Sequence, residues 1–359
     1  MLALGFMTLN LKSENSYFTE LAKNAAKYQI QCFRFVPSQI NPVTEKVVGE
    51  EFVEESQTWR KGEFTLPVCL YDRCFYGDDA HSKQCMAIVN WLKTRKDIQF
   101  LGYGLPNKME LYHVLSQSRL AAYIPKTIKV ESSSQVIHTL EAINPLILKP
   151  INGSQGYGIY YIEKIDGNFI VRTDKKEKQI SRTFETDQQL LKWLETLLQK
   201  ITFLLQPYLP LTNDDEQPYD VRSLLQKNET NNWDIIGKGV RVGQKGGIIS
   251  NLSAGATILP FNDWLDSASV RSKNYICEEI DYILKNLPLI LEQHFLPLFE
   301  LGVDIGIAKN GAIWLLDVNS KPGRKVISTI APKKKEQLME SPLRFANVLV
   351  NKVIPERSQ

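Results

Sequence analysis

Residues 300–323 read Glu300-Leu-Gly-Val-Asp304-Ile-Gly-Ile-Ala-Lys-Asn310-Gly311-Ala-Ile-Trp-Leu-Leu-Asp317-Val-Asn319-Ser-Lys-Pro-Gly323. The Asn310-Gly311 pair lies between two apolar runs, which is a strong signal for a β-hairpin with a two-residue turn. Asp304 stands six residues before this turn and Asp317 six after it. The two carboxylates are therefore predicted to lie opposite each other, with Cβ atoms about 4.5–5.5 Å apart. Asn319 shares that face because strand side chains alternate.

Two like charges placed opposite each other destabilise a sheet unless a cation lies between them. The oxygen-only group of Asp304, Asp317 and Asn319 suits a hard cation, and we expect Mg²⁺ that carries substrate phosphates. The alternative is a solvent-facing hairpin whose acids are simply hydrated.

Composition sets wide bounds on function. The chain has 359 residues, of which 43% are hydrophobic and 23% charged, and its net charge is +3. These values are typical of a globular protein with two or three packed units. Nothing in them indicates a nucleic-acid or membrane partner, and no stretch approaches the roughly 20 apolar residues of a membrane span. Five cysteines without a CxxC spacing suggest reduced thiols and a cytoplasmic location.

We expect three domains, at residues 1–105, 106–205 and 206–359. The first alternates short apolar runs with helical patterns, which favours an α/β layer with a largely parallel sheet. Arg73 follows its third expected strand, 67–71. Ligand groups gather at such strand ends, so Arg73 is either a ligand-binding residue or a structural ion-pair partner.

The second domain carries a glycine-rich loop. It reads Lys149-Pro-Ile-Asn-Gly153-Ser154-Gln155-Gly156-Tyr-Gly158 and lies between two expected strands. It is neither a Walker P-loop nor a dinucleotide fingerprint. Its glycines leave backbone N–H groups free to cover a polyphosphate, and Lys149 adds a positive charge. A plain glycine hairpin is the alternative.

Three further polar residues lie between the loop and the hairpin. Arg222 and Arg241 are on neighbouring antiparallel strands in our prediction, where either could hold a phosphate bidentately or form a surface ion pair. Asn251 follows Gly246-Gly247 in an expected mobile loop. It contacts substrate or phosphate, or else it is only a turn residue.

Taken in order, these motifs resemble those of the ATP-grasp superfamily, and within it the YheC/YheD-like group of endospore coat-associated proteins. The resemblance covers nearly the whole chain. It rests on Tyr71-Asp-Arg73, Asn107-Lys108-Met-Glu-Leu-Tyr112, Leu148-Lys149-Pro, Gly153-Ser-x-Gly-x-Gly158, Asp220-Val-Arg222, Ile249-Ser-Asn251-Leu-Ser253, Gly302-Val-Asp304-Ile and Asp317-Val-Asn319-Ser-Lys-Pro-Gly323. It implies an ATP-grasp fold, of mixed α/β and α+β class, with an N-terminal Rossmann-like (pre-ATP-grasp) α/β domain.

The resemblance also implies roles for individual residues. Lys108 and Lys149 would hold the phosphates of ATP, and the 153–158 loop would close over them. Asp317 stands where many superfamily members have Glu, and we expect this shorter side chain to favour one Mg²⁺ over two. The adenine-reading hinge would be Gln206, Pro207, Tyr208 and Leu209, and the metal ligands Asp304, Asp317 and Asn319.

The implied activity is that of a Mg-ATP-dependent carboxylate–amine ligase acting through an acyl phosphate on small-molecule or peptide substrates. Alternatives are a structural spore-surface protein that binds ATP with little turnover, and an ATP-grasp kinase. The group's name implies association with the endospore coat. The opposed aspartates favour the enzyme, because a purely structural descendant would have no reason to keep two acids that repel without a cation.

Overall fold

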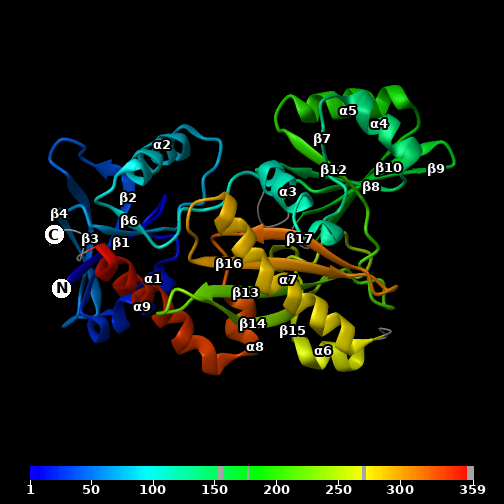
Figure 1. Ribbon diagram of the computed structural model, residues 1–359. Helices are drawn as coiled ribbons and strands as arrows, with labels where there is room; N and C mark the ends of the chain where they lie inside the picture. Colours follow the sequence, from blue (N-terminus) through cyan, green and yellow to red (C-terminus); the bar gives the residue numbers. More distant parts are fainter. Residues whose placement is uncertain (153–156, 176–177, 269–271, 354–359) are drawn as a thin grey trace.

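The computed structural model describes residues 1–152, 157–175, 178–268 and 272–353. The strands in this part of the chain form three sheets, drawn from residues 2–100, 128–207 and 219–319. In Figure 1 the second sheet and its two helices stand apart from the other two sheets, at the upper right. Among the described residues, no helix has the length and apolar character needed to cross a membrane.

The first sheet contains β1 (Leu2–Met7), β2 (Ile30–Ile40), β3 (Lys46–Val53), β4 (Thr58–Thr65), β5 (Cys69–Asp72) and β6 (Gln99–Phe100), with helices α1 (Asn15–Ala25) and α2 (Ala80–Thr94). Its order is β4-β3-β2-β1-β5-β6. Strands β2, β1, β5 and β6 are parallel. The expected largely parallel sheet is confirmed, and the β3–β4 hairpin adds two antiparallel strands at one edge.

The second sheet contains β7 (Ile128–Lys129), β8 (Leu146–Pro150), β9 (Tyr160–Ile165), β10 (Asn168–Lys175), β11 (Lys178–Phe184) and β12 (Phe203–Pro207), in the order β11-β10-β9-β8-β12-β7. Neighbouring strands in this sheet are antiparallel. Helices α4 (Ser133–Ala142) and α5 (Asp187–Leu198) pack on it through buried Val136, Leu140, Leu190 and Leu194.

The third sheet has the order β15-β14-β13-β16-β17. Its strands are β13 (Tyr219–Lys227), β14 (Trp233–Val242), β15 (Thr257–Pro260), β16 (Glu300–Ile307) and β17 (Ile313–Asn319). The helices around it are α3 (Lys108–Ser116), α6 (Phe261–Ser267), α7 (Lys273–His294), α8 (Lys325–Ile330) and α9 (Lys335–Val353). Short 3-10 turns are η1 (Ala26–Tyr28), η2 (Ala121–Tyr123), η3 (Leu252–Ala254) and η4 (Pro332–Lys334). The predicted antiparallel pairing of the strands that carry Arg222 and Arg241 is confirmed.

A buried ion-pair network ties the first sheet to the third. Arg73, only 1% exposed, donates to Glu300 at 3.1 Å and to Glu14 at 2.8 Å. Arg324 donates to Glu300 at 2.9 Å. Arg73 is thus a structural ion-pair partner, which decides between the two interpretations of that residue. Helix α9 strengthens the same junction, because it lies beside α1 (Figure 1) and its Leu338, Leu343 and Phe345 share a core with Leu4 and Phe6.

Candidate functional site

Strands β16 and β17 pair Asp304 with Asp317, as the sequence predicts. The turn, however, differs from the prediction. Ala308 N–H donates to Ala312 O at 2.8 Å, so the loop holds three residues and not two. Nearer the turn the register places Ile305 opposite Leu315, which leaves Leu316 without a partner on β16. This bulge adds one residue to β17 and restores the pairing of the two acids.

The bulge at Leu316 decides which way Asp317 faces. Ile313 and Leu315 belong to the core on the α7 side of the sheet, and Val318 belongs to the same core. Strict alternation would send Asp317 into that core after Leu315. The extra residue reverses the phase, so that Asp317 and Asn319 leave the core together on the face that carries Asp304.

Positively charged side chains already surround both carboxylates. Arg222 Nε lies 2.6 Å from Asp304 Oδ1, and Arg241 Nη2 lies 3.1 Å from Asp304 Oδ2. Lys108 Nζ donates to Asp317 Oδ1 at 2.9 Å. The sequence predicts that the two acids repel each other unless a metal ion lies between them. That prediction is wrong, because the protein supplies its own counter-charges. The opposed acids alone no longer favour the enzyme over a structural protein.

The arginine side of this cluster is buried and tightly bonded. Arg241 Nε donates to Asp220 Oδ1 at 2.7 Å, and its Nη2 also pairs with Asp220. The interpretation of Arg222 and Arg241 as surface ion pairs is wrong, because Arg241 is buried and the Arg222 side chain is only 13% exposed. Gly302 makes room for Arg222, since a Cβ at that position would lie 2.7 Å from its Nη1.

The pKa values of the two acids are shifted in opposite directions, although burial acts alike on both. Burial raises the pKa of Asp304 above the ordinary value, although Arg222 and Arg241 oppose it. Burial acts in the same direction on Asp317, but Lys108 and Lys149 outweigh it and lower the pKa of that carboxyl. Asp317 is therefore the more firmly ionised of the two acids.

Lys149 projects from the end of β8 towards the bulge. Its Nζ donates to the Tyr112 hydroxyl at 2.6 Å and approaches Leu316 O at 3.5 Å, while the Tyr112 hydroxyl donates to Leu316 O at 2.6 Å. Burial, reinforced by nearby Lys108, lowers the pKa of Lys149 to about 7. Among the described residues no carboxylate forms an ion pair with this amine. Asp317 is near enough to favour the charged amine but is not in contact with it, so the amine is suited to receiving a further anion.

The side chain of Asn107 caps α3 by accepting from the N–H groups of Met109 and Glu110. The cap fixes Lys108 as the first residue of the helix. Tyr112 is four residues further on, one helical turn away, and so faces the same way as Lys108. Helix α3 therefore places the side chains of Lys108 and Tyr112 against strand β17.

The expected hinge lies at the edge of the second sheet. Strand β7 pairs with β12 only at Leu204 and Leu205. On the side of β12 that faces β7, no described strand pairs with the chain from Gln206 to Leu209. Gln206 Nε2 donates to Thr127 Oγ1 at 2.6 Å, and Tyr208 N–H donates to Pro145 O at 3.0 Å. Backbone groups on such an open edge remain available to a planar ligand.

The predicted glycine loop is only partly described. Gly153, Ser154, Gln155 and Gly156 lie outside the described residues. Gly158 has φ +75°, and a Cβ there would lie 2.9 Å from the Pro150 ring, so only glycine fits this position without strain.

Asn251 is not brought into contact with the acids. It precedes η3, where its backbone carbonyl accepts from Ala254 N–H at 2.9 Å. Within the described ranges, no hydrogen bond joins its side chain to the rest of the cluster. The turn-residue interpretation describes this geometry, and substrate contact stays a proposal.

Sequence reasoning missed two residues that join the second sheet to the loop after β14. Asp174 on β10 accepts hydrogen bonds from Ile248 N–H at 2.7 Å and Ile249 N–H at 3.0 Å. Gln179 Nε2 on β11 donates to Gly246 O at 2.7 Å. The loop after β14 is therefore fastened to the second sheet.

Comparison with protein families matches residues 97–349 to the family described as YheC/D like ATP-grasp. The chain belongs to this family. It is 38% identical to Endospore coat-associated protein YheC of Bacillus subtilis (strain 168) over 368 aligned residues, which cover the full length of both proteins.

Solved structures share the ATP-grasp fold. D-alanyl-alanine synthetase A from Vibrio cholerae O1 biovar eltor has a TM-score of 0.57 at 12% identity, with 97% of this chain and 98% of that chain covered. The RiPP-associated ATP-grasp ligase of Chryseobacterium gregarium, in complex with ADP and a leader and core peptide, has a TM-score of 0.53 at 12% identity, with 98% and 97% covered. The fold implied by the sequence resemblance is confirmed, and at these identities the likeness extends to the fold alone.

The ATP-grasp protein's cluster offers oxygen atoms of the kind that a hard cation prefers. Asp304 Oδ1 is buried and lacks an aligned hydrogen bond, although Arg222 Nε lies 2.6 Å away. Asn319 Nδ2 donates to Asp317 Oδ2 at 3.2 Å, which places the amide group beside the Asp317 carboxylate. Carboxylate and amide oxygens are suitable ligands for Mg²⁺. Within the described residues, no group of three or more His, Cys, Asp or Glu could hold a metal, so a cation here depends on the amide or on phosphate oxygens.

Proposed function

We propose that this ATP-grasp protein binds Mg-ATP and joins a carboxylate to an amine through an acyl phosphate. The observation that carries the proposal is the convergence on Asp304 and Asp317 of two lysines from separate elements and two arginines from neighbouring strands. Phosphoryl transfer depends mainly on positioning and on neutralising charge, and this cluster supplies both.

The nucleotide would lie between the second and third sheets. Lys108 and Lys149 hold its phosphates in this proposal, and the 153–158 loop covers them. The segment from Gln206 to Leu209, at the end of β12 and just beyond it, accepts the adenine through backbone groups in this proposal. Asp304, Asp317 and Asn319 would hold Mg²⁺, which neutralises phosphate charge when bound.

In the proposed reaction a substrate carboxylate oxygen attacks the γ-phosphorus. The new O–P bond forms as the bond to the β,γ-bridging oxygen breaks, which releases ADP. An amine then attacks the acyl carbon, the C–N bond forms, inorganic phosphate leaves, and the amine gives up a proton. Arg222 and Arg241 stabilise the transferring phosphoryl group, and Asn251 contacts the substrate. The substrates are small-molecule or peptide carboxylates and amines.

One observation favours a second candidate, a structural protein that binds ATP with little turnover. The acids are already balanced by Lys108, Arg222 and Arg241, so the cluster does not need a metal for stability. The name of the 38% identical relative supports association with the endospore coat for either candidate.

Calorimetry with ATP, with and without Mg²⁺, tests the shared step of both candidates. We expect binding that requires the metal, and no detectable binding at millimolar ATP would overturn the proposal. Mass spectrometry of the purified protein would identify a copurifying nucleotide and ligand. ADP and phosphate release with carboxylate–amine pairs identifies the ligase. A phosphorylated hydroxyl product identifies a kinase, and binding without turnover identifies the structural protein.

A further inference from the structure

Helix α7 carries a line of exposed apolar side chains. Its inner face is buried in the core against the third sheet. On its outer face Tyr275, Tyr282 and Leu289 are 47%, 41% and 50% exposed. They recur every seven residues, and a heptad spacing places them almost in line along a helix. Large apolar side chains gathered in one line indicate a contact surface.

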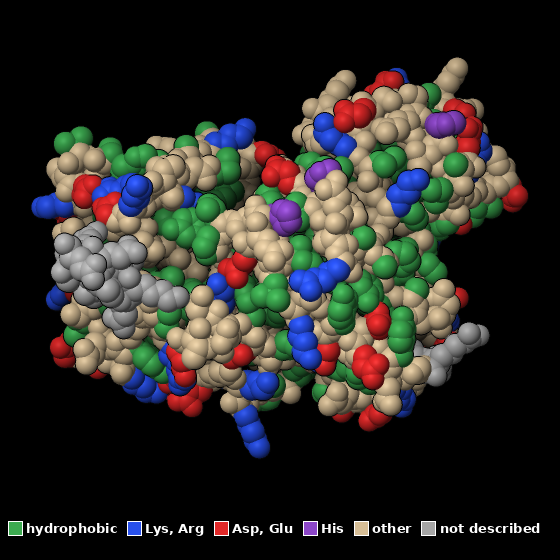
Figure 2. Space-filling model, in the orientation of Figure 1, with side chains coloured by type: hydrophobic (Ala, Val, Ile, Leu, Met, Phe, Trp, Pro, Cys, Tyr) green, Lys and Arg blue, Asp and Glu red, His purple; other side chains and the backbone are tan. Residues whose placement is uncertain are grey.

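Two charged residues lie along one flank of this line. Glu278 and Lys285 are both exposed. Neither side chain has an ion-pair or hydrogen-bond partner among the described residues. Figure 2 shows this face of the molecule, where hydrophobic side chains alternate with charges of both signs over the region of α7.

We propose that α7 docks in antiparallel orientation against α7 of a second copy of this chain, about a two-fold axis at Tyr282. Tyr275 and Leu289 stand seven residues on either side of Tyr282. The axis therefore brings Tyr275 of one copy to Leu289 of the other, and the two Tyr282 rings to each other. Such self-complementary contacts are the property that a two-fold interface requires.

The charges select this orientation. Glu278 is four residues before Tyr282 and Lys285 three after it, on the same flank. In the antiparallel pair Glu278 of each copy meets Lys285 of the other. In a parallel pair the two-fold axis runs along the helices and puts the two charged flanks on opposite sides of the interface, so Glu278 and Lys285 would find no opposite charge in each other. Opposite charges across an interface fix its register.

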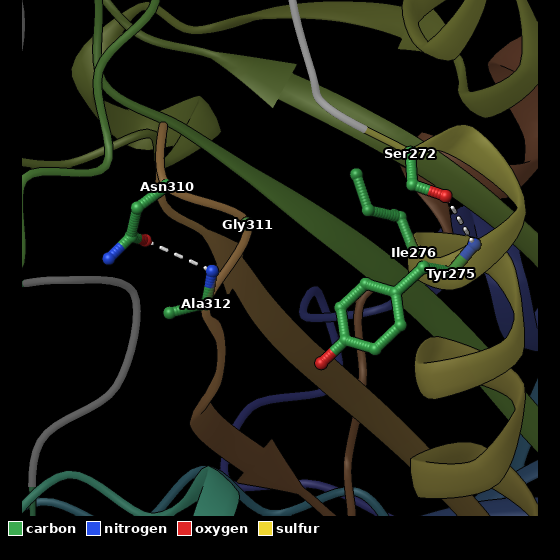
Figure 3. Close-up of a pocket in the computed structure, with 6 residues that line it drawn as sticks. All are labelled: Ser272, Tyr275, Ile276, Asn310, Gly311 and Ala312. Carbon is green, nitrogen blue, oxygen red and sulfur yellow. Dashed lines mark hydrogen bonds between the residues drawn. The ribbon is translucent and has the colours of Figure 1, made fainter.

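The surface is also supported from beneath. The Tyr282 ring contacts Tyr123 on η2, with centroids 6.3 Å apart, and the Tyr123 hydroxyl donates to Glu279. Tyr275 borders a hollow of about 420 Å³ between the start of α7 and the β16–β17 turn. Figure 3 shows the residues that line it. The hollow leaves room beside Tyr275 for Leu289 of the second copy.

The contact is limited in size. A 22-residue helix is about 33 Å long. One helix from each copy buries less than the roughly 800 Å² per partner of a standard interface. The dimer is therefore weak, and its population depends on protein concentration.

Analytical ultracentrifugation of the full chain across a range of concentrations tests the proposal. We expect the wild type to shift from monomer to dimer. Lys285→Glu and Glu278→Lys should each weaken dimerisation by about tenfold, because two attractive pairs become repulsive. The combination of both substitutions restores opposite charges and should return the affinity close to that of the wild type.

Lys192→Glu is the matched control, since it makes the same charge change on the exposed surface of α5. It should leave dimerisation unchanged. A wild type that is monomeric at every concentration overturns the proposal, as does a dimer that survives Lys285→Glu or one that the double substitution fails to restore. Thermal melts at low concentration verify that each variant is folded. No readout depends on nucleotide, so the result is independent of the proposed function.

Discussion

Asp304 and Asp317 are cross-strand neighbours, but arginines surround the first and lysines the second. Arg241 is held bidentately by Asp220 as well as by Asp304, so the Asp304 half is fixed within the sheet. Lys108 is a point charge on a flexible stem at the start of a helix, with a side chain 18% exposed. We therefore expect the Asp317 half to exchange partners more readily than the Asp304 half when a phosphate or cation arrives.

The pKa directions agree with this difference. Burial dominates at Asp304 and raises its pKa. At Asp317 the lysines overcome burial and lower the pKa. A firmly ionised, partly exposed carboxylate is the better primary metal ligand, so we infer that a cation depends more on Asp317 than on Asp304. Substitutions on the two sides should accordingly affect different properties.

The largest effect on stability should come from Asp304→Asn. It removes the carboxylate that pairs with Arg222 at 2.6 Å, and breaking a buried ion pair costs about 3–5 kcal/mol. Chemical denaturation would measure the loss. Asp281→Asn is the control, because its pair with Lys238 lies at the surface and should contribute less than about 1 kcal/mol. Equal losses for the two variants would show that Arg222 does not depend on Asp304.

The next largest effect should be on the pH dependence of nucleotide binding. In the free protein the pKa of Lys149 is lowered to about 7, so above that pH the amine is mostly neutral. A phosphate favours the charged form, and binding must then take up a proton. We expect the affinity for Mg-ATP to fall as pH rises above 7, approaching about tenfold per pH unit.

Lys149→Met is the control for this prediction, since it should bind weakly and with little dependence on pH. Because the pKa of Lys149 is lower in the folded than in the unfolded state, the lysine contributes less stability as pH falls towards 7. The variant should therefore melt no lower than the wild type at neutral pH. Calorimetry in buffers of different ionisation enthalpy counts the protons. An equal pH slope in both proteins would contradict the assignment to Lys149.

Residue counting predicted that Asp304 faces Asp317, but it did so through two differences that cancel. The loop has one residue more than expected, and the bulge at Leu316 adds one to β17. Residue counting cannot detect two differences that cancel, because it uses only the number of residues between the two acids. The bulge matters nonetheless, since it turns Asp317 away from the core and gives Lys149 and Tyr112 a free carbonyl.

Other features were missed because a local sequence pattern carries no information about them. Strand β4 is largely exposed, so it lacks the apolar alternation that reveals a strand. The partner that makes Arg73 structural, Glu300, is 227 residues away, and no local pattern could identify it. Tyr112 could have been found, because it lies one helical turn beyond Lys108 and shares its face.

Tyr112→Phe should have an intermediate effect on the lysine side. The change removes the hydroxyl that accepts from Lys149 and donates to Leu316 O. Leaving buried polar groups unpaired costs about 1–3 kcal/mol, and the remaining 3.5 Å approach of Lys149 to that carbonyl reduces this to about 1–2 kcal/mol. Tyr160→Phe is the control, because its hydroxyl has no hydrogen-bond partner among the described residues. If both variants unfold at the same denaturant concentration as the wild type, the hydroxyl does not brace the bulge.

The smallest effect on stability should come from Asp317→Asn. The opposed acids taken alone would repel, and the change would then leave the protein equally or more stable. The contact with Lys108 reverses that expectation, because the amide cannot replace the charge that the lysine faces. Both side chains are partly exposed, so we expect a loss of about 0.5–1 kcal/mol.

A double-mutant cycle with Lys108→Met isolates this pair, since its coupling energy should account for most of the loss. Melts with Mg-ATP then separate the two roles of Asp317. The wild type should gain stability from Mg-ATP and Asp317→Asn much less, because the cation loses its charged ligand. A variant that is more stable than the wild type without ligand would show that repulsion between the acids outweighs the lysine. Equal stabilisation of both proteins by Mg-ATP would show that Asp317 does not hold the metal.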